Sequence, residues 1–107
     1  MSRFAKQVGA FLFLASLTFP AAQAGEQEKG KALAVKLCAL CHVIDNENPF
    51  GGIGSTPSFP LMAKYAEMFR PRIRTFEGRR PHAQFQWDVN EADIADLEAY
   101  IMSLAVK

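Results

Sequence analysis

The chain is poor in cysteine and histidine, with only two of each among its 107 residues, and it has a single tryptophan. It has no internal repeat, no low-complexity tract and no stretch that resembles a linker between domains. No nucleophile, acid–base pair or metal-activated water site can be assembled that would indicate an independent enzyme. The sequence therefore predicts one small domain that is not itself an enzyme.

Long apolar runs are also missing. The longest, residues 8–19, has 12 apolar or small residues, and a membrane-spanning helix needs roughly 20. This run follows a basic N-terminus and precedes Ala22-x-Ala24, the usual form of a cleavage site. We therefore expect residues 1–24 to be a cleaved secretory signal peptide, which leaves residues 25–107 exported to the periplasm without stable membrane insertion. The alternative is an uncleaved anchor.

One motif contains both cysteines and half of the histidines, Cys38-Ala39-Leu40-Cys41-His42. Two thiols at this spacing can each add to a vinyl group of one porphyrin, and the histidine that follows can coordinate its iron. The sequence therefore predicts one covalent haem c, with Cys38 and Cys41 as thioether residues and His42 as proximal iron ligand.

Three other uses of a CxxC pair compete with haem attachment: a redox dithiol, half of a zinc site and a structural disulfide. A redox dithiol is expected within a β-α-β pattern, but the chain has no strand-like alternation of Val, Ile or Thr. A zinc site usually needs four ligands, and the only spare one, His82, lies far along the chain. Haem attachment is the preferred interpretation.

The rest of the chain reads as helices and loops. Residues 26–40 form an amphipathic pattern, with Leu33, Leu37 and Leu40 on one face, and residues 45–57 are dense in turn residues. Ser58 is then suited to begin a second helix, which we expect to be interrupted at Pro71.

The C-terminal part follows the same alternation of helix and loop. We expect one further turn around Ile73 and Phe76, and then a loop over residues 78–89. Asn90 and Asp93 resemble a capping box, and an apolar stripe after them predicts a final helix. The fold class is therefore all-α, with helices wrapped around a flat cofactor.

Several of these segments resemble the small class I c-type cytochromes of bacteria. The resemblance rests on the haem motif with Gly30 and Leu33 before it, on Thr56-Pro57-Ser58-Phe59, and on the ending over residues 93–104. It implies a cytochrome c-like domain over residues 25–107, with three to four helices around one haem. It also implies that the Pro57 carbonyl accepts the Nδ1 proton of His42, and that Gly30 lets the first helix approach Tyr100 in the last.

The sixth iron ligand is where the chain departs from that family. Its members usually carry a Met-Pro pair before the last helix, whereas the corresponding residues 79–87 contain no methionine. His82 is the nearest residue able to bind iron from the distal side, although it could instead be an exposed loop histidine or contact a propionate. Met62 is a weaker candidate because it falls on an apolar stripe, Met68 is equally weak and Met102 is weaker still. An iron left five-coordinate or holding water is the remaining alternative.

Surface features suggest how such a haem would be used. Trp87, with Phe76 and Phe85, could form an apolar wall over the haem, although core packing would need the same residues. Five arginines fall within residues 70–80 and five acids within residues 88–98. This asymmetry could steer a redox partner if the segments lie apart, or it could be a solvated face with one arginine at a propionate. The overall charge balance does not suggest nucleic acid.

We therefore expect a one-electron carrier between periplasmic redox protein partners. Two alternatives are a gas-binding or sensing haem protein with an open distal site, and a haem subunit of a larger oxidoreductase.

Overall fold

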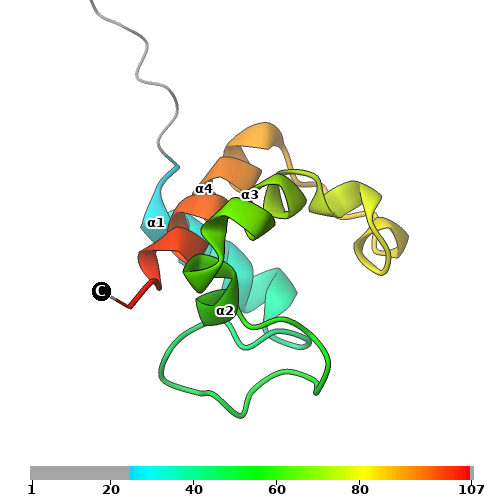
Figure 1. The fold of residues 1–107 in the computed structure, drawn as a ribbon. Coiled ribbons are helices and arrows are strands. Elements are labelled where there is room, and N and C mark those ends of the chain that lie inside the picture. Colours follow the sequence, from blue (N-terminus) through cyan, green and yellow to red (C-terminus); the bar gives the residue numbers. More distant parts are fainter. Residues whose placement is uncertain (1–24, 107) are drawn as a thin grey trace, which may run out of the picture.

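A computed structural model describes residues 25–106, so the expected signal peptide lies outside the described residues. Within this range the chain is helical and contains no strand, which confirms the all-α prediction (Figure 1). The elements are α1 (Gln27–Leu33), the π-helical turn η1 (Ala34–Cys38), α2 (Phe59–Lys64), α3 (Ala66–Arg74), the 3₁₀ turns η2 (Phe76–Gly78) and η3 (His82–Gln84), and α4 (Glu91–Ser103). None of the helices described is long and apolar enough to span a bilayer.

The most extensive contact between helices is the crossing of α1 and α4. Gly30 is buried there, and a Cβ atom added to it would lie 2.8 Å from the Tyr100 Cβ and closer still to the Asp96 backbone. The Glu26 backbone N–H also donates to Asp96 Oδ1 at 2.7 Å. The absence of a side chain at Gly30 is therefore what lets the two helices approach, as the resemblance implied.

The first helix ends earlier than expected and departs in part from its predicted face. It changes to a π-helical turn at Ala34 and ends at Cys38, where Ala39 N–H donates to Ala34 O at 3.0 Å. Leu40, expected on the apolar face, is 87% exposed, whereas Ala34 is fully buried. The wider turn rotates the residues that follow it. Leu33 packs against the core and Leu37 lines the cavity half-buried, so the leucine pattern holds for these two residues and is wrong for the burial of Leu40.

The second helical region is divided at Tyr65 rather than at Pro71. Ser58 accepts a hydrogen bond from Leu61 N–H at 3.2 Å and begins α2, as expected. Tyr65 leaves the helical conformation, and α3 then continues through Pro71 to Arg74. The expected interruption at Pro71 is therefore wrong. Pro71 has no N–H and cannot donate a helical hydrogen bond. Burial of Ile73 in the core, two residues later, offsets the free-energy cost of losing it.

The final helix is the one that the sequence predicts best. Asn90 and Asp93 form the capping box, with Asp93 N–H donating to Asn90 Oδ1 at 2.9 Å and Asn90 N–H to Asp93 Oδ2 at 3.0 Å. Its inner face buries Leu97, Tyr100 and Ile101. The Tyr100 hydroxyl donates to the Ile44 carbonyl at 2.7 Å, which ties α4 to the chain just after the haem motif.

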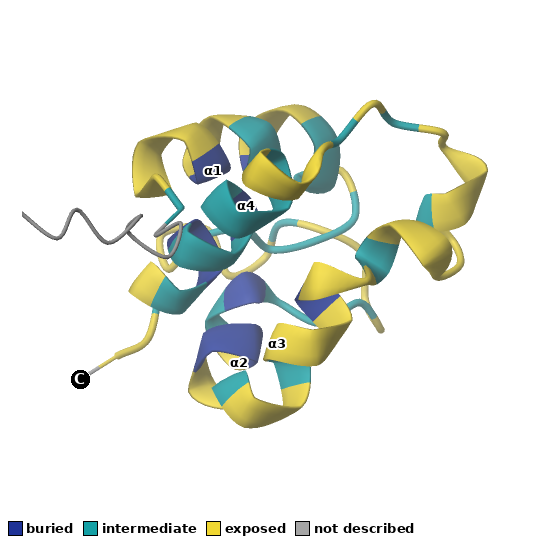
Figure 2. Ribbon diagram, turned by 90° about the horizontal axis from the view of Figure 1, so that it is seen from above, coloured by how far each residue is buried: buried dark blue, intermediate teal, exposed yellow. Residues whose placement is uncertain are grey.

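The core lies between α1, η1, α2, α4 and the end of α3, where the dark blue residues of Figure 2 gather. It consists of Ala34, Phe59, Met62, Ile73, Leu97, Tyr100 and Ile101. No residue of the segment 75–89 is buried, and this segment lies to one side of the bundle in Figure 1. We call residues 75–89 the distal segment.

Candidate haem site

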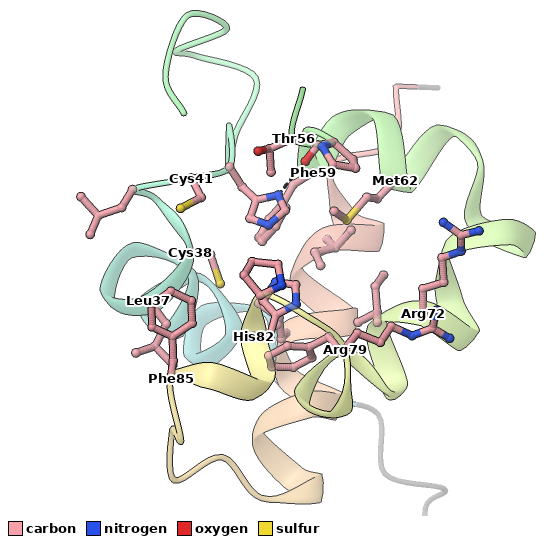
Figure 3. Close-up of a pocket in the computed structure, with 18 of the residues that line it drawn as sticks. Leu37, Cys38, Cys41, Thr56, Phe59, Met62, Arg72, Arg79, His82 and Phe85 are labelled. Carbon is pink, nitrogen blue, oxygen red and sulfur yellow. Dashed lines mark hydrogen bonds between the residues drawn. The ribbon is translucent and has the colours of Figure 1, made fainter. Parts of the chain in front are cut away.

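A cavity of about 700 Å³ opens between the core helices and the distal segment. Both cysteines and both histidines of the chain line it. Figure 3 shows Cys38 and Cys41 along one wall and His82 entering from the distal segment. Most of the remaining lining is apolar, as is typical of a site that takes a large flat cofactor.

The two cysteines are free and partly buried. Burial, and secondarily the neighbouring Cys41, raise the pKa of the Cys38 thiol to about 11. A redox dithiol of the thioredoxin kind needs a thiol whose pKa is lowered, because the thiolate is the nucleophile. The environment of Cys38 therefore argues against that use of the pair.

His42 is held by the backbone of the loop that follows the motif. Its Nδ1 lies 2.6 Å from the Pro57 carbonyl oxygen. This oxygen can only accept a hydrogen bond, so Nδ1 carries the proton and Nε2 keeps a lone pair for a metal. The ring of Phe59 lies 5.5 Å from that of His42 and supports it from the core side. The hydrogen bond to Pro57 implied by the family resemblance is therefore present.

The loop between His42 and Pro57 is pinned to the haem motif. Ile53 N–H donates to the Cys41 carbonyl at 3.0 Å, and Phe59 N–H donates to the Val43 carbonyl at 2.8 Å. Gly52 has a φ of +78°, and a Cβ atom there would meet the Cys41 carbonyl oxygen at 2.9 Å. This close approach needs glycine. The sequence predicted only a loop around Gly52. The Gly51-Gly52 pair is the signal that could have indicated the tight turn.

His82 faces His42 across the cavity. Their ring centres are 6.1 Å apart and their planes differ by only 10°. The His82 Nδ1 is buried and makes no well-formed hydrogen bond among the described atoms. Burial, and then the nearby His42, lower the pKa of His82 against the opposing effect of the Arg79 backbone.

Aromatic side chains of the distal segment hold the His82 ring in place. Phe76 meets it edge to face at 5.3 Å, and Trp87 lies at 6.3 Å. Phe85 stacks directly on Trp87, with ring centres 4.8 Å apart. All three aromatic residues line the cavity. The apolar wall expected from Trp87 is thus present. Phe76 also packs against the core cluster, whereas Phe85 and Trp87 line the cavity without belonging to that cluster.

The methionines occupy other positions. Met62 lines the cavity but is buried within the core cluster, which accounts for its presence. Met68 is 56% exposed, and neither Met68 nor Met102 is among the residues that line the cavity.

The charged residues around the cavity all carry the same sign. Those described are Lys36, Arg72, Arg79 and Arg80, all exposed, and no acidic residue joins them. Figure 3 shows Arg72 and Arg79 on the side of the cavity away from the cysteines. The arginine-rich sequence pointed to this region, whereas Lys36 was not singled out, although it lies two residues before Cys38.

The expected separation of the arginine and acidic segments is not found between α3 and α4. Glu98 accepts from Arg74 Nε at 2.8 Å and from Arg70 Nη1 at 2.9 Å. Hydrogen bonding by Arg74, more than offsetting the opposing effect of burial, lowers the pKa of Glu98, with Arg70 contributing in the same direction. The positive charge is therefore concentrated at the cavity mouth, because two of the arginines are paired on α4.

These residues fit a haem. The cavity is large and apolar, two thiols lie on one wall, and two imidazoles face each other across it. The buried His82 Nδ1, which makes no well-formed hydrogen bond to the protein, fits a site that a further group completes. An arginine at the cavity rim could pair with a propionate carboxylate of a haem. When bound, the haem supplies an iron that gains and loses one electron, while the chain holds, orients and shields it.

The fold and this site define an all-α protein with one covalently attached haem. A comparison with known families agrees, since the cytochrome c family model matches residues 27–105. The chain belongs to the cytochrome c family. It is therefore a small c-type cytochrome that binds haem c and transfers electrons through it. No curated protein and no solved structure matched the chain significantly.

Proposed function

We propose that this cytochrome is an exported carrier that moves single electrons between redox proteins of the periplasm. Cys38 and Cys41 hold the haem through thioethers, and His42 ligates the iron with its ring oriented by Pro57. The signal-like N-terminus supports export. An exported chain would receive its covalent haem outside the cytoplasm. The haem changes by one electron, and no substrate is transformed.

The observation that carries this proposal is the composition of the cavity mouth. The charged groups that line it are basic, and Leu40 and Ile53, which also line it, are exposed apolar side chains. Exposed apolar side chains together with charge of one sign are typical of a surface that binds a redox partner briefly. Electrostatic attraction speeds the encounter with the partner, and a small contact area allows its rapid release. We therefore propose redox partners whose docking surface is acidic.

Two measurements test the proposal. The full chain, produced in bacteria that attach haem c, should be recovered from the periplasmic fraction with an N-terminus at Gly25 and the mass of one haem added. Recovery of an intact N-terminus in the membrane fraction would contradict export.

The docking surface can be probed with two small oxidants of opposite charge, anionic hexacyanoferrate(III) and cationic tris(phenanthroline)cobalt(III). We expect the anion to oxidise the reduced protein faster at low salt, and its advantage to shrink in Arg79→Gln. Lys31→Gln, an exposed cation of α1 outside the cavity, is the matched control. Equal salt dependence for both oxidants would contradict a basic docking surface.

A further inference from the structure

We infer that His82 is the second axial ligand of the haem iron, so that the iron is held between His42 and His82. This inference rests on the family's haem and not on the proposed carrier role. It follows from the geometry of the two rings, from the surroundings of His82 and from the positions of the other candidate ligands.

The spacing of the two rings matches that of imidazoles on opposite sides of one metal. An imidazole nitrogen binds a metal at about 2.0 Å and lies roughly 1.1 Å from its ring centre, so two opposed ligands have ring centres about 6.2 Å apart. The His42 and His82 ring centres are 6.1 Å apart. Since His42 Nδ1 is engaged by Pro57, its Nε2 is the nitrogen left for the iron.

Direct stacking does not explain this spacing. The Phe85 and Trp87 rings, which do stack in the same site, have centres 4.8 Å apart with planes 7° apart. The His42 and His82 planes are almost as close to parallel, at 10°. Their ring centres, however, lie 1.3 Å farther apart than those of Phe85 and Trp87. The imidazoles are therefore held in matching orientations without the close contact that stacking would give.

The surroundings of His82 are those of a ligand whose partner is a cofactor. Its Nδ1 is buried and makes no well-formed hydrogen bond to the protein, although the Arg79 backbone lies nearby. Phe76 meets the ring edge to face at 87°, which restrains its rotation. An exposed loop histidine would have neither feature, and a histidine that contacted only a propionate would not need a ring plane matched to that of His42.

The other candidates are less well placed. Met62 belongs to α2, as does Phe59, which supports His42 from the core side. Figure 3 shows Met62 beside Phe59, whereas His82 comes from η3 in the distal segment. A sixth ligand must come from the face opposite His42, and among the described residues at the cavity His82 meets this requirement.

Two nitrogen ligands have measurable consequences. The iron would be low-spin in both oxidation states, and its distal position would be closed to carbon monoxide. The reduction potential would be lower than with one histidine and one methionine, since methionine ligation raises it. The near-parallel rings also predict a rhombic low-spin electron paramagnetic resonance signal, rather than the strongly anisotropic signal of perpendicular ligands.

The test uses the purified protein with haem attached. In the ferric wild type, near-infrared magnetic circular dichroism should assign two nitrogen ligands, without a thioether-to-iron band. His82→Ala should become high-spin and bind carbon monoxide at least ~10-fold faster when reduced, and added imidazole should restore the low-spin spectrum. His82→Met should show the thioether band and a raised potential.

Matched controls separate ligation from packing. Met68→Leu removes an exposed thioether that lies outside the cavity, and Gln84→Ala alters an exposed neighbour of His82 on η3, so both should retain the wild-type spectrum. A thioether band in the wild type, a low-spin His82→Ala, or equally fast carbon monoxide binding in the wild type would overturn the inference.

The design also holds if His82→Ala accumulates poorly, because the wild-type and His82→Met spectra decide the ligand without it. If the inference fails while the protein still passes electrons to small oxidants, the proposed carrier role is unaffected.

Discussion

The two walls of the haem cavity are built in different ways. The wall that carries Cys38, Cys41 and His42 is continuous with the buried core and is tied to it through Pro57 and Tyr100. The opposite wall, the distal segment of residues 75–89, has only two short 3₁₀ turns and no buried residue. The wall with the haem motif is thus stabilised by side chains of the protein core. The distal segment instead directs apolar rings at the cavity.

This difference indicates where stability and where cofactor chemistry reside. Local stability follows buried contacts, so the core helices should resist unfolding more than the distal segment does. The distal segment, in turn, depends on the haem for contacts that its own chain does not supply. Changes in the core packing behind the first wall should therefore act on folding, whereas changes at Cys38, Cys41 or the distal segment should act on the haem.

The largest effect is expected from removing the haem attachment itself. Replacing Cys38 and Cys41 together by serine abolishes both thioethers, so intact mass should show no covalent haem. Limited proteolysis should then cut preferentially within residues 75–89, because the apolar rings of the distal segment lose their partner. Equal cleavage of α4 and the distal segment would contradict the comparison of the two walls.

The next largest effect is expected at the α1–α4 crossing. Gly30→Ala places a Cβ atom 2.8 Å from that of Tyr100 and against the Asp96 backbone, and backbone atoms cannot move aside cheaply. We expect the free energy of unfolding to fall by roughly 3 kcal/mol in denaturant titrations followed by circular dichroism. Gly54→Ala is the control, because a Cβ atom there meets nothing within 4 Å. Similar losses in both variants would refute a close crossing at Gly30.

A smaller effect is expected from the bond between α4 and the haem motif. Tyr100→Phe keeps the ring but removes the hydroxyl that donates to the Ile44 carbonyl. Because the ring is buried, we expect a loss of about 1–2 kcal/mol in unfolding free energy. Tyr65→Phe, at a half-exposed ring, should change stability little. The axial-ligand spectrum should stay the same in both, and a spectral change in Tyr100→Phe would show that the two walls are coupled.

The smallest effect is expected at Glu98, and it depends on pH. Hydrogen bonding by Arg74 lowers the pKa of this carboxyl in the folded state. Its contribution to stability is therefore fully present above the unfolded pKa, about 4.3, and is lost as the pH falls through the lower folded value. Glu98→Gln should lower the midpoint of thermal unfolding by a few degrees at pH 7, and the difference from wild type should vanish in acid.

The control for Glu98 is Glu77→Gln, an exposed residue of η2 without an ion pair among the described contacts. A difference between wild type and Glu98→Gln that persists below the folded pKa would mean that the packing of Glu98, rather than its charge, stabilises the α3–α4 contact.

Local sequence signals predicted those parts of the fold whose causes are local. The capping box of α4 and the Ser58 cap need only residues a turn away, so the sequence located both. The haem motif is likewise five consecutive residues. The predicted face of the first helix holds at Leu33 but not at Leu40, which follows a π-helical turn that the leucine spacing did not indicate and is exposed.

The continuation of α3 through Pro71 is a non-local outcome, since burial of Ile73 overrides the local preference of proline. The distribution of charge is a second, because the pairing of Glu98 with two arginines joins segments more than twenty residues apart.

The sequence by itself determined that this protein is helical and tethers a haem at Cys38 and Cys41 with His42 beside them, because covalent attachment and iron ligation both depend on neighbouring residues. Only the tertiary structure decided what faces His42 across the cavity. His82 is forty residues away along the chain, and its distance and orientation relative to His42 arise from packing of the distal segment rather than from any local pattern.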